Sequence, residues 1–306
     1  MRGKRKDATP AKDLDTMHKF MPYLLGGRTA NEAVMVESVD LSAVNRYIEQ
    51  KNSENPDFKY TLFHVISAAI AKTVYHRPLT NRFIMGGRYY DRNQISLAFV
   101  VKKAFCDKGA EALAICRIKD NSSPLEQIRT QIYKIVHAVR KENKTDGATD
   151  IMDALTALPP FIIRLAVRFL KFLDKHGKLP MSIINEDPYH CTVFISNLGS
   201  IKLHAGYHHL TDWGTNSFFV IIGEKYKKIH INEDNSTDVR EYLDLAITVD
   251  ERIADGYYFA QTVKILRAVL ENPQLLEETI DMPINDMGVR IKGKEDTNAR
   301  AKSPMA

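Results

Sequence analysis

Apolar and polar positions follow two different periods along the chain. Residues 33–39 alternate and are rich in valine, which predicts a strand, and the polar turn after them is typical of a helix start. In residues 62–74 the apolar positions are spaced by three and four residues, which predicts one face of a helix. By the same criteria further strands are expected at 94–102, 191–195, 218–223 and 243–249, and further helices at 124–141 and 259–270. Strands and helices mixed in this way predict an α/β fold.

The chain of 306 residues contains no internal repeat and no Gly/Ser-rich linker, so we expect one folded unit at 17–280. Residues 1–16 are polar and begin with a cluster of basic side chains, and they are predicted to form a flexible basic arm. Residues 281–306 lose the apolar periodicity and are predicted to form a disordered tail.

Composition narrows the class of protein. Hydrophobic residues make up 44% and charged residues 26%, which is typical of a soluble globular protein. The net charge of +5 is small and partly concentrated at the N-terminus, which argues against a nucleic-acid-binding protein. The most apolar run, 158–173, is too short and too charged to be a transmembrane segment. Three cysteines (Cys106, Cys116, Cys191) cannot all pair, which favours reduced thiols and a cytoplasmic location.

Two short strings each follow a predicted strand and each end in glycine. Residues 194–199 read F-I-S-N-L-G, and residues 250–256 read D-E-R-I-A-D-G. A strand that ends in a polar turn holds reactive side chains rigidly, so both turns are candidate sites. Taken alone, each is also typical of a turn with a purely structural role.

Together and in this order, the two strings resemble the catalytic domain of 2-oxo acid dehydrogenase acyltransferases, which shares its fold with chloramphenicol acetyltransferase. In that family an S-N-x-G turn precedes an H-R-x-x-D-G motif, and an L-E-x-P string follows. Here Ser196 and Glu251 are 55 residues apart, and L-E-N-P follows at 270–273. The resemblance covers about 17–280 and implies a chloramphenicol-acetyltransferase-like fold. That fold is a single α/β domain with a mixed β-sheet flanked by helices, and it forms trimers.

The resemblance also implies roles for individual residues. In the family the histidine is the general base on a thiol, the serine donates a hydrogen bond to the oxyanion, and the aspartate holds the turn through an ion pair. The serine and the aspartate are here Ser196 and Asp255, and Glu251 replaces the histidine. The remaining motif positions are expected to contact substrate: Asn197, Gly199 and Gly256.

A glutamate is a weaker base than a histidine. A thiol titrates near ~8.5, a histidine near ~6.5 and a glutamate near ~4.3, so proton transfer to glutamate is uphill by roughly 5–6 kcal/mol, against about 3 for histidine. Burial of Glu251 would narrow this gap, and an amine acceptor would need a base only to lose its proton. In a third hypothesis the site is inactive and Glu251 only pairs with Arg252 or another cation.

We therefore expect an acyltransferase that moves an acyl group from a coenzyme A thioester to a small acceptor, with Glu251 as the base. The alternative is a non-catalytic trimeric binding or scaffolding relative. The chain shows no lipoyl domain, which favours free acyl-CoA as donor. In the family the active site lies between subunits, so Glu251 and Ser196 are expected to meet across a homotrimer interface. The acyl chain length and the acceptor stay open.

Three neighbouring histidines raise two further hypotheses. His204, His208 and His209 lack a carboxylate or cysteine at zinc-binding spacing, so no metal site is expected. In the family the stretch after the S-N-x-G turn lies near the active site, so His208 or His209 is a candidate substitute base and substrate contact.

Residues 161–175 form a predicted helix with a basic stripe. Arg164, Arg168, Lys171 and Lys175 recur every three or four residues among apolar side chains. This pattern fits an interfacial helix, a helix that covers an acyl site, or an ordinary packed helix with a solvated basic edge.

Overall fold

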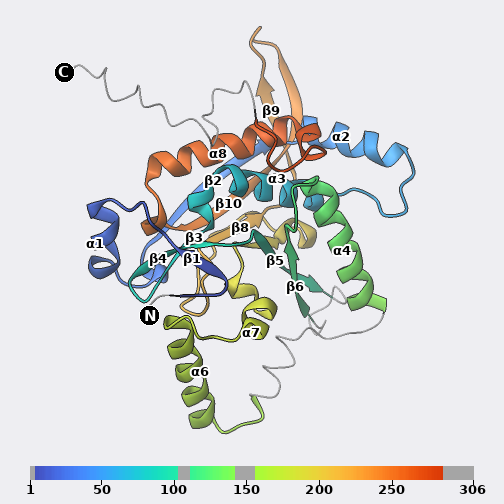
Figure 1. Cartoon of the computed structure of the whole chain (residues 1–306). Helices are drawn as coiled ribbons and strands as arrows, with labels where there is room; N and C mark the ends of the chain where they lie inside the picture. The colour runs from blue at the N-terminus through green and yellow to red at the C-terminus, as the bar shows by residue number, and fades with distance from the viewer. Residues whose placement is uncertain (1–3, 103–110, 142–155, 285–306) are drawn as a thin grey trace, which may run out of the picture.

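The structure is a computed structural model that describes residues 4–102, 111–141 and 156–284. Figure 1 shows a central sheet with most helices on one side of it. The helices are α1 (Thr16–Leu24), α2 (Ser42–Ser53), α3 (Leu62–His76), α4 (Pro124–Lys141), α6 (Pro160–Lys175), α7 (Met181–Glu186) and α8 (Gly256–Glu271). The strands are β1 (Ala8–Pro10), β2 (Glu32–Asp40), β3 (Arg82–Met85), β4 (Arg88–Arg92), β5 (Ser96–Lys102), β6 (Glu111–Arg117), β7 (Val193–Asn197), β8 (Phe218–Ile222), β9 (Tyr226–Ile231) and β10 (Thr237–Asp250).

The main sheet is mixed, with strand order β2-β10-β8-β7-β5-β6. β5, β7 and β8 are parallel to one another, and the remaining neighbours are antiparallel. β8 and the first three residues of β7 are continuous apolar runs because both of their faces are covered, as parallel strands require. The mixed sheet flanked by helices confirms the predicted fold class.

Helices α3, α4 and α8 bury the main core against one face of this sheet. α3 is buried almost throughout, which its run of alanine and isoleucine permits. Its first turn is closed by a capping box, in which the Thr61 hydroxyl accepts from the His64 N–H and the His64 ring accepts from the Thr61 N–H. α8 ends before Pro273, as the sequence predicts.

The segment around Leu210, which has no regular secondary structure, covers the opposite face of the sheet. Leu210 is buried there against Phe194 and Phe219, which stack with their ring centroids 5.0 Å apart. The carboxylate of Glu32, at the start of β2, accepts hydrogen bonds from the Leu210 N–H and the Tyr207 hydroxyl. The segment is therefore tied to the edge strand of the sheet.

The predicted flexible arm at 1–16 is wrong for the residues that the structure describes. β1 pairs with β4 in a small antiparallel sheet of order β1-β4-β3. The Arg5 guanidinium is buried, with Nη2 2.8 Å from Asp174 Oδ1 and Nε 2.9 Å from Asp7 Oδ1. The arm is ordered because its arginine meets a carboxylate far away in sequence. At the other end of the chain, residues 281–283 are exposed and Ile284 is buried, and residues 285–306 of the predicted tail lie outside the described residues.

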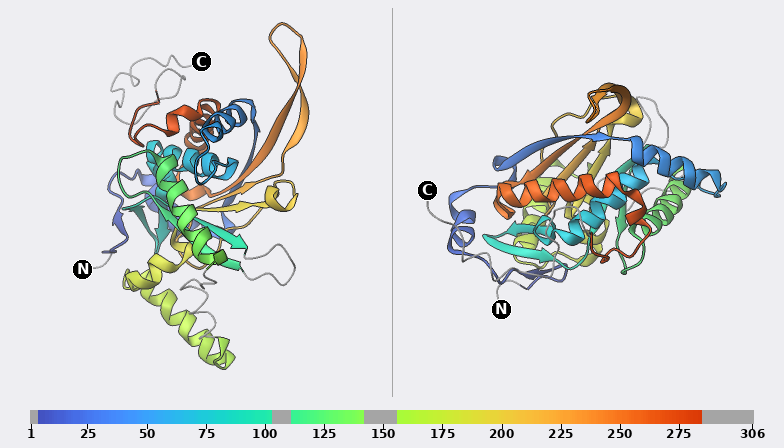
Figure 2. Two further views of the ribbon diagram at one scale, coloured as in Figure 1. Left: turned by 90° about the vertical axis from the view of Figure 1, so that its right-hand side faces the viewer. Right: turned by 90° about the horizontal axis from the view of Figure 1, so that it is seen from above.

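Most predicted elements are confirmed within a few residues, including the strands that carry the two motifs. β3, β4 and β6 were not predicted, and neither was the hairpin of β9 with the outer half of β10 that projects in the left view of Figure 2. In the described ranges no helix has the length and apolarity needed to cross a membrane. Cys116 and Cys191 are buried free thiols, and burial raises their pKa to about 12 and about 11; Cys106 lies outside the described residues.

Candidate active site

A groove of about 400 Å³ lies at the carboxyl end of β7, between the sheet and helices α3 and α4. Its lining is mostly apolar and includes Phe63, Phe99, Ile132, Val136 and Ile195. Ser196 and Asn197 add polar groups to this lining. Ser196 is partly exposed, and its hydroxyl makes no hydrogen bond with another described residue. The volume lies within the range of small-molecule sites, and the hydroxyl is free to donate to a ligand.

The turn after Ser196 is held by local hydrogen bonds and close backbone packing. Asn197 Oδ1 accepts from the Ser200 N–H at 3.3 Å, and the Ser200 hydroxyl donates to the Asn197 carbonyl at 2.7 Å. A Cβ on Gly199 would lie 2.9 Å from the carbonyl carbon of Gly223, so only glycine fits. A second cavity of about 190 Å³ adjoins the turn and shares Asn197 and Ser200 with the groove. The close packing of the turn against the backbone of Gly223 therefore explains why glycine stands at position 199.

Glu251 lies at the opposite end of the sheet, in a 3-10 turn (Glu251–Ile253) directly after β10. Its N–H donates to the Asn31 carbonyl at 3.0 Å, which fixes the backbone. The carboxylate is exposed and makes no hydrogen bond or ion pair with another described residue. Glu251 is thus presented to the outside of the single chain.

The adjacent Arg252 belongs to a buried ion pair. Its Nε lies 2.8 Å from Asp250 Oδ1 and its Nη2 lies 2.7 Å from Asp250 Oδ2, a bidentate geometry. The Tyr89 hydroxyl donates to the Arg252 carbonyl at 3.0 Å. The hypothesis that Glu251 pairs with Arg252 is therefore wrong, because this guanidinium is occupied by Asp250.

Asp255 caps α8, since its Oδ1 accepts from the Tyr258 N–H at 2.7 Å. The ion pair expected of Asp255 is absent among the described residues, and Asp250 and Arg252 form the ion pair of this turn instead. Gly256 is the first residue of α8 and has open space around it. Both residues share the Glu251 end of the sheet.

The strand register separates the two motifs within one chain. Ser196 pairs with Ile221 of β8, and Ile221 pairs with Ala246 of β10. Glu251 comes five residues after Ala246. With about 3.3 Å per residue and about 4.8 Å per strand, Ser196 and Glu251 are about 19 Å apart. One copy of the chain cannot bring the two side chains to one substrate.

Neither candidate histidine lines the groove. The His208 ring stacks on Phe219, with centroids 4.2 Å apart, on the sheet face that carries Phe194. His209 Nδ1 lies 2.7 Å from the Leu210 carbonyl oxygen. The described residues contain no group of three or more His, Cys, Asp or Glu side chains that could hold a metal ion.

Several groove residues had no sequence signal as site residues. Phe63 and Ile132 read as core positions of helices, because periodicity marks an apolar face without showing whether a cavity lies beside it. Lys102 and Glu111 also line the groove and form an ion pair with Nζ 3.7 Å from Oε1. They belong to adjacent strands, and their pairing depends on strand register.

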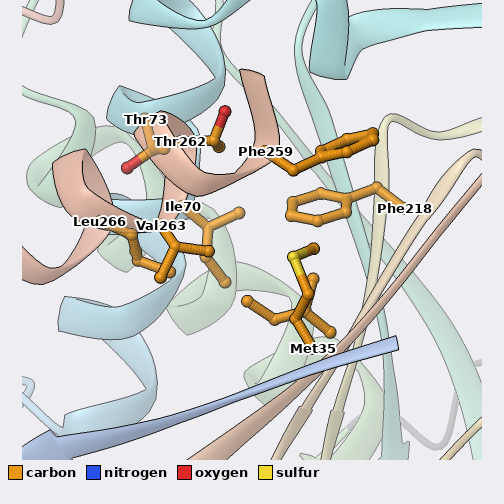
Figure 3. A pocket seen from close by; sticks show the side chains of 9 residues that line it. Met35, Ile70, Thr73, Phe218, Phe259, Thr262, Val263 and Leu266 are labelled. Atoms are coloured by element: carbon orange, nitrogen blue, oxygen red, sulfur yellow. The ribbon is translucent and has the colours of Figure 1, made fainter. Parts of the chain in front are cut away.

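Figure 3 shows a third, small cavity between α3, α8 and the sheet, with Met35, Phe218, Phe259 and Thr73 around it. Its volume of about 10 Å³ is at most enough for one water molecule. This cavity is a packing defect of the core and is too small for a substrate.

No protein-family model matches the chain, and no curated protein matches its sequence. Solved structures match its fold. A probable dihydrolipoamide acetyltransferase from Listeria monocytogenes gives a TM-score of 0.56 at 14% identity, over 86% of this chain and 95% of that one. The cubic core of the pyruvate dehydrogenase multienzyme complex gives 0.57 at 13%, over 87% and 93%. A chloramphenicol acetyltransferase gives 0.55 at 12%, over 86% and 99%. The chain therefore has the fold of these acyltransferase cores, as the resemblance implied.

Proposed function

We propose that the protein is an acyltransferase that moves an acyl group from a coenzyme A thioester to a small acceptor. The observation that carries this proposal is the Ser196 hydroxyl in an apolar groove, without a hydrogen bond to another described residue, at the turn of a fold shared with acetyltransferases. The apolar lining suits an acyl group or the thioester arm, and Ser196 and Asn197 supply polar contacts beside the reacting carbonyl.

In the proposed reaction the acceptor attacks the thioester carbonyl carbon while Glu251 takes the acceptor's proton. The Ser196 hydroxyl donates a hydrogen bond to the oxyanion that forms. Collapse of this intermediate breaks the carbon–sulfur bond, the acyl group stays on the acceptor, and the proton passes from Glu251 to the coenzyme A thiolate. Atoms and charge balance without a metal or a redox partner.

The site requires two copies of the chain. Because Ser196 and Glu251 lie about 19 Å apart in one copy, Glu251 must come from a neighbour. The related cubic core is a multi-copy assembly, which supports this arrangement. The chain also exposes large apolar side chains near both motifs, Phe20 and Tyr23 on α1 and Leu203 after the serine turn. We therefore propose a homotrimer in which each site joins Ser196 of one copy to Glu251 of the next.

Release of free coenzyme A thiol tests the proposal. Acetyl-CoA and a longer acyl-CoA are each incubated with the protein, with and without pooled thiol and amine acceptors. We expect acceptor-dependent release that Glu251→Gln removes while the oligomer persists. Unchanged release in Glu251→Gln would contradict the role of Glu251.

The non-catalytic scaffold is the second candidate, favoured by one observation: the exposed Glu251 carboxylate is not positioned by a hydrogen bond or ion pair to any described residue. Failure to release thiol from any donor, in an oligomer that also fails to bind coenzyme A, would support the scaffold over the enzyme.

A further inference from the structure

α6 projects from the body of the molecule, and only its C-terminal end reaches the core (Figures 1 and 2). That end is held by buried charges. Asp174 Oδ1 lies 2.8 Å from Arg5 Nη2, and Asp174 Oδ2 lies 3.3 Å from His190 Nε2. His190 Nδ1 lies 2.9 Å from Asp187 Oδ2. Although burial opposes it, hydrogen bonds to these two carboxylates raise the pKa of His190.

Gly177 lies just after the C-terminal end of α6, next to these buried charges. Its φ of +68° is a left-handed conformation, and a Cβ there would lie 3.3 Å from the carbonyl carbon of Lys4. The N-terminal segment therefore packs directly behind the helix. The core thus holds the C-terminal end of α6 and sets the direction in which the helix projects.

The outward face of α6 is apolar and largely aromatic. Phe161, Leu165, Phe169 and Phe172 are spaced by four, four and three residues, and between 56% and 70% of each side chain is exposed. At 100° per residue they fill an arc of about 80°. Three phenylalanines on one exposed arc form a patch that monomeric soluble proteins rarely leave in water.

A basic arc lies directly beside this patch. Arg164, Arg168, Lys171 and Lys175 are all exposed and fill the neighbouring 60° or so of the helix. The one acidic residue of α6, Asp174, points to the core and is paired with Arg5. The exposed half of the helix thus carries four cations and no anion.

We propose that α6 docks the protein on an anionic phospholipid surface. Aromatic and aliphatic side chains beside arginine and lysine are the pattern of helices that lie in a membrane interface. An anionic lipid surface would bury the apolar arc and neutralise the basic arc together. A second copy of α6 would bury the apolar arc but offers no acid to the four cations. This inference is independent of the proposed acyl transfer.

Vesicle flotation tests it with the full chain. We expect binding to vesicles of phosphatidylcholine mixed with phosphatidylglycerol, little binding to phosphatidylcholine alone, and loss of binding in high salt. Each cation near the surface contributes about fivefold in partitioning, so Arg164→Gln/Arg168→Gln should bind about 25-fold more weakly. Phe161→Ser/Phe169→Ser should bind at least about tenfold more weakly.

Lys134→Gln/Lys264→Gln is the matched control, because it removes the same charge at exposed positions of α4 and α8. It should bind like the unchanged protein. Phe169→Trp gives a second readout, a blue shift of emission on anionic vesicles. The proposal would be overturned if the unchanged protein did not bind anionic vesicles, or if the control variant lost as much vesicle binding as the α6 variants. It would also be overturned if the α6 variants changed the oligomeric state while vesicle binding stayed the same.

Discussion

A two-variant mixing experiment addresses the geometry of the proposed site directly. Ser196→Ala removes the oxyanion donor and Glu251→Gln removes the base, so each variant alone should be inactive or nearly so. Loss of one oxyanion donor costs about 10²–10³ in rate, and loss of a general base costs about 10²–10⁴. Neither change touches the buried core, because Ser196 is partly exposed and Glu251 is exposed.

The activity expected in mixed oligomers of the two variants follows from the strand register. With about 19 Å between Ser196 and Glu251 in one chain, a working site needs an intact serine from one copy and an intact glutamate from the next. When the two variants assemble at random in equal amounts, half the copies supply the serine and half supply the glutamate. About one quarter of the sites are then complete in a cyclic oligomer with head-to-tail contacts.

The variants are co-expressed or refolded together, and acceptor-dependent thiol release is compared with that of each variant alone. A chain that carries both substitutions, mixed with Ser196→Ala, is the matched control and should recover nothing. Activity equal to the sum of the separate variants, in samples where native mass spectrometry demonstrates mixed oligomers, would refute the shared site.

Three further predictions concern the fold. The Thr73 hydroxyl is buried without a hydrogen-bond partner among the described residues, so Thr73→Val should raise the unfolding free energy by about 1 kcal/mol in urea titration; a loss of stability would contradict this. Burial, with a smaller effect of a nearby arginine, lowers the pKa of His64 to about 4. Because the unfolded chain takes up this proton near ~6.5 and the folded chain does not, stability should fall by roughly 3 kcal/mol as pH drops from ~6.5 to ~4. In His64→Gln, which can still complete the capping box with Thr61, the urea midpoint should depend less on pH over this range. An unchanged pH dependence would exclude His64 as the cause. Gly199→Ala should destabilise the protein by about 1–3 kcal/mol because its Cβ meets the backbone of Gly223; an unchanged melting temperature would show that the turn adapts.

Local patterns sufficed where the structure follows from neighbouring residues. α3 is predicted by the spacing of its apolar positions, because a helix repeats every 3.6 residues whatever its surroundings. β7, β8 and the inner half of β10 are predicted because strands covered on both faces are rich in apolar residues. The position of each motif at the end of a strand follows from the same apolar runs. The motif order was enough to imply the fold.

Structural features that depend on residues far apart in the sequence could not be predicted from local patterns. Arg5 is ordered by Asp174, 169 residues away, so a basic N-terminus that reads as a flexible arm is packed. The basic stripe of α6 is visible in the sequence, but the exposure of Phe161 and its neighbours depends on how the core orients the helix.

For the candidate site, too, the sequence determined some features and the tertiary structure determined others. The sequence by itself determined which side chains lie at strand ends, Ser196 and Glu251 among them, because strand ends are marked by local apolar runs. Only the tertiary structure decided that the two lie at opposite ends of the sheet, since the direction and order of strands depend on long-range pairing. It also decided that Arg252 pairs with Asp250, so that the exposed Glu251 carboxylate has no ion pair with another described residue.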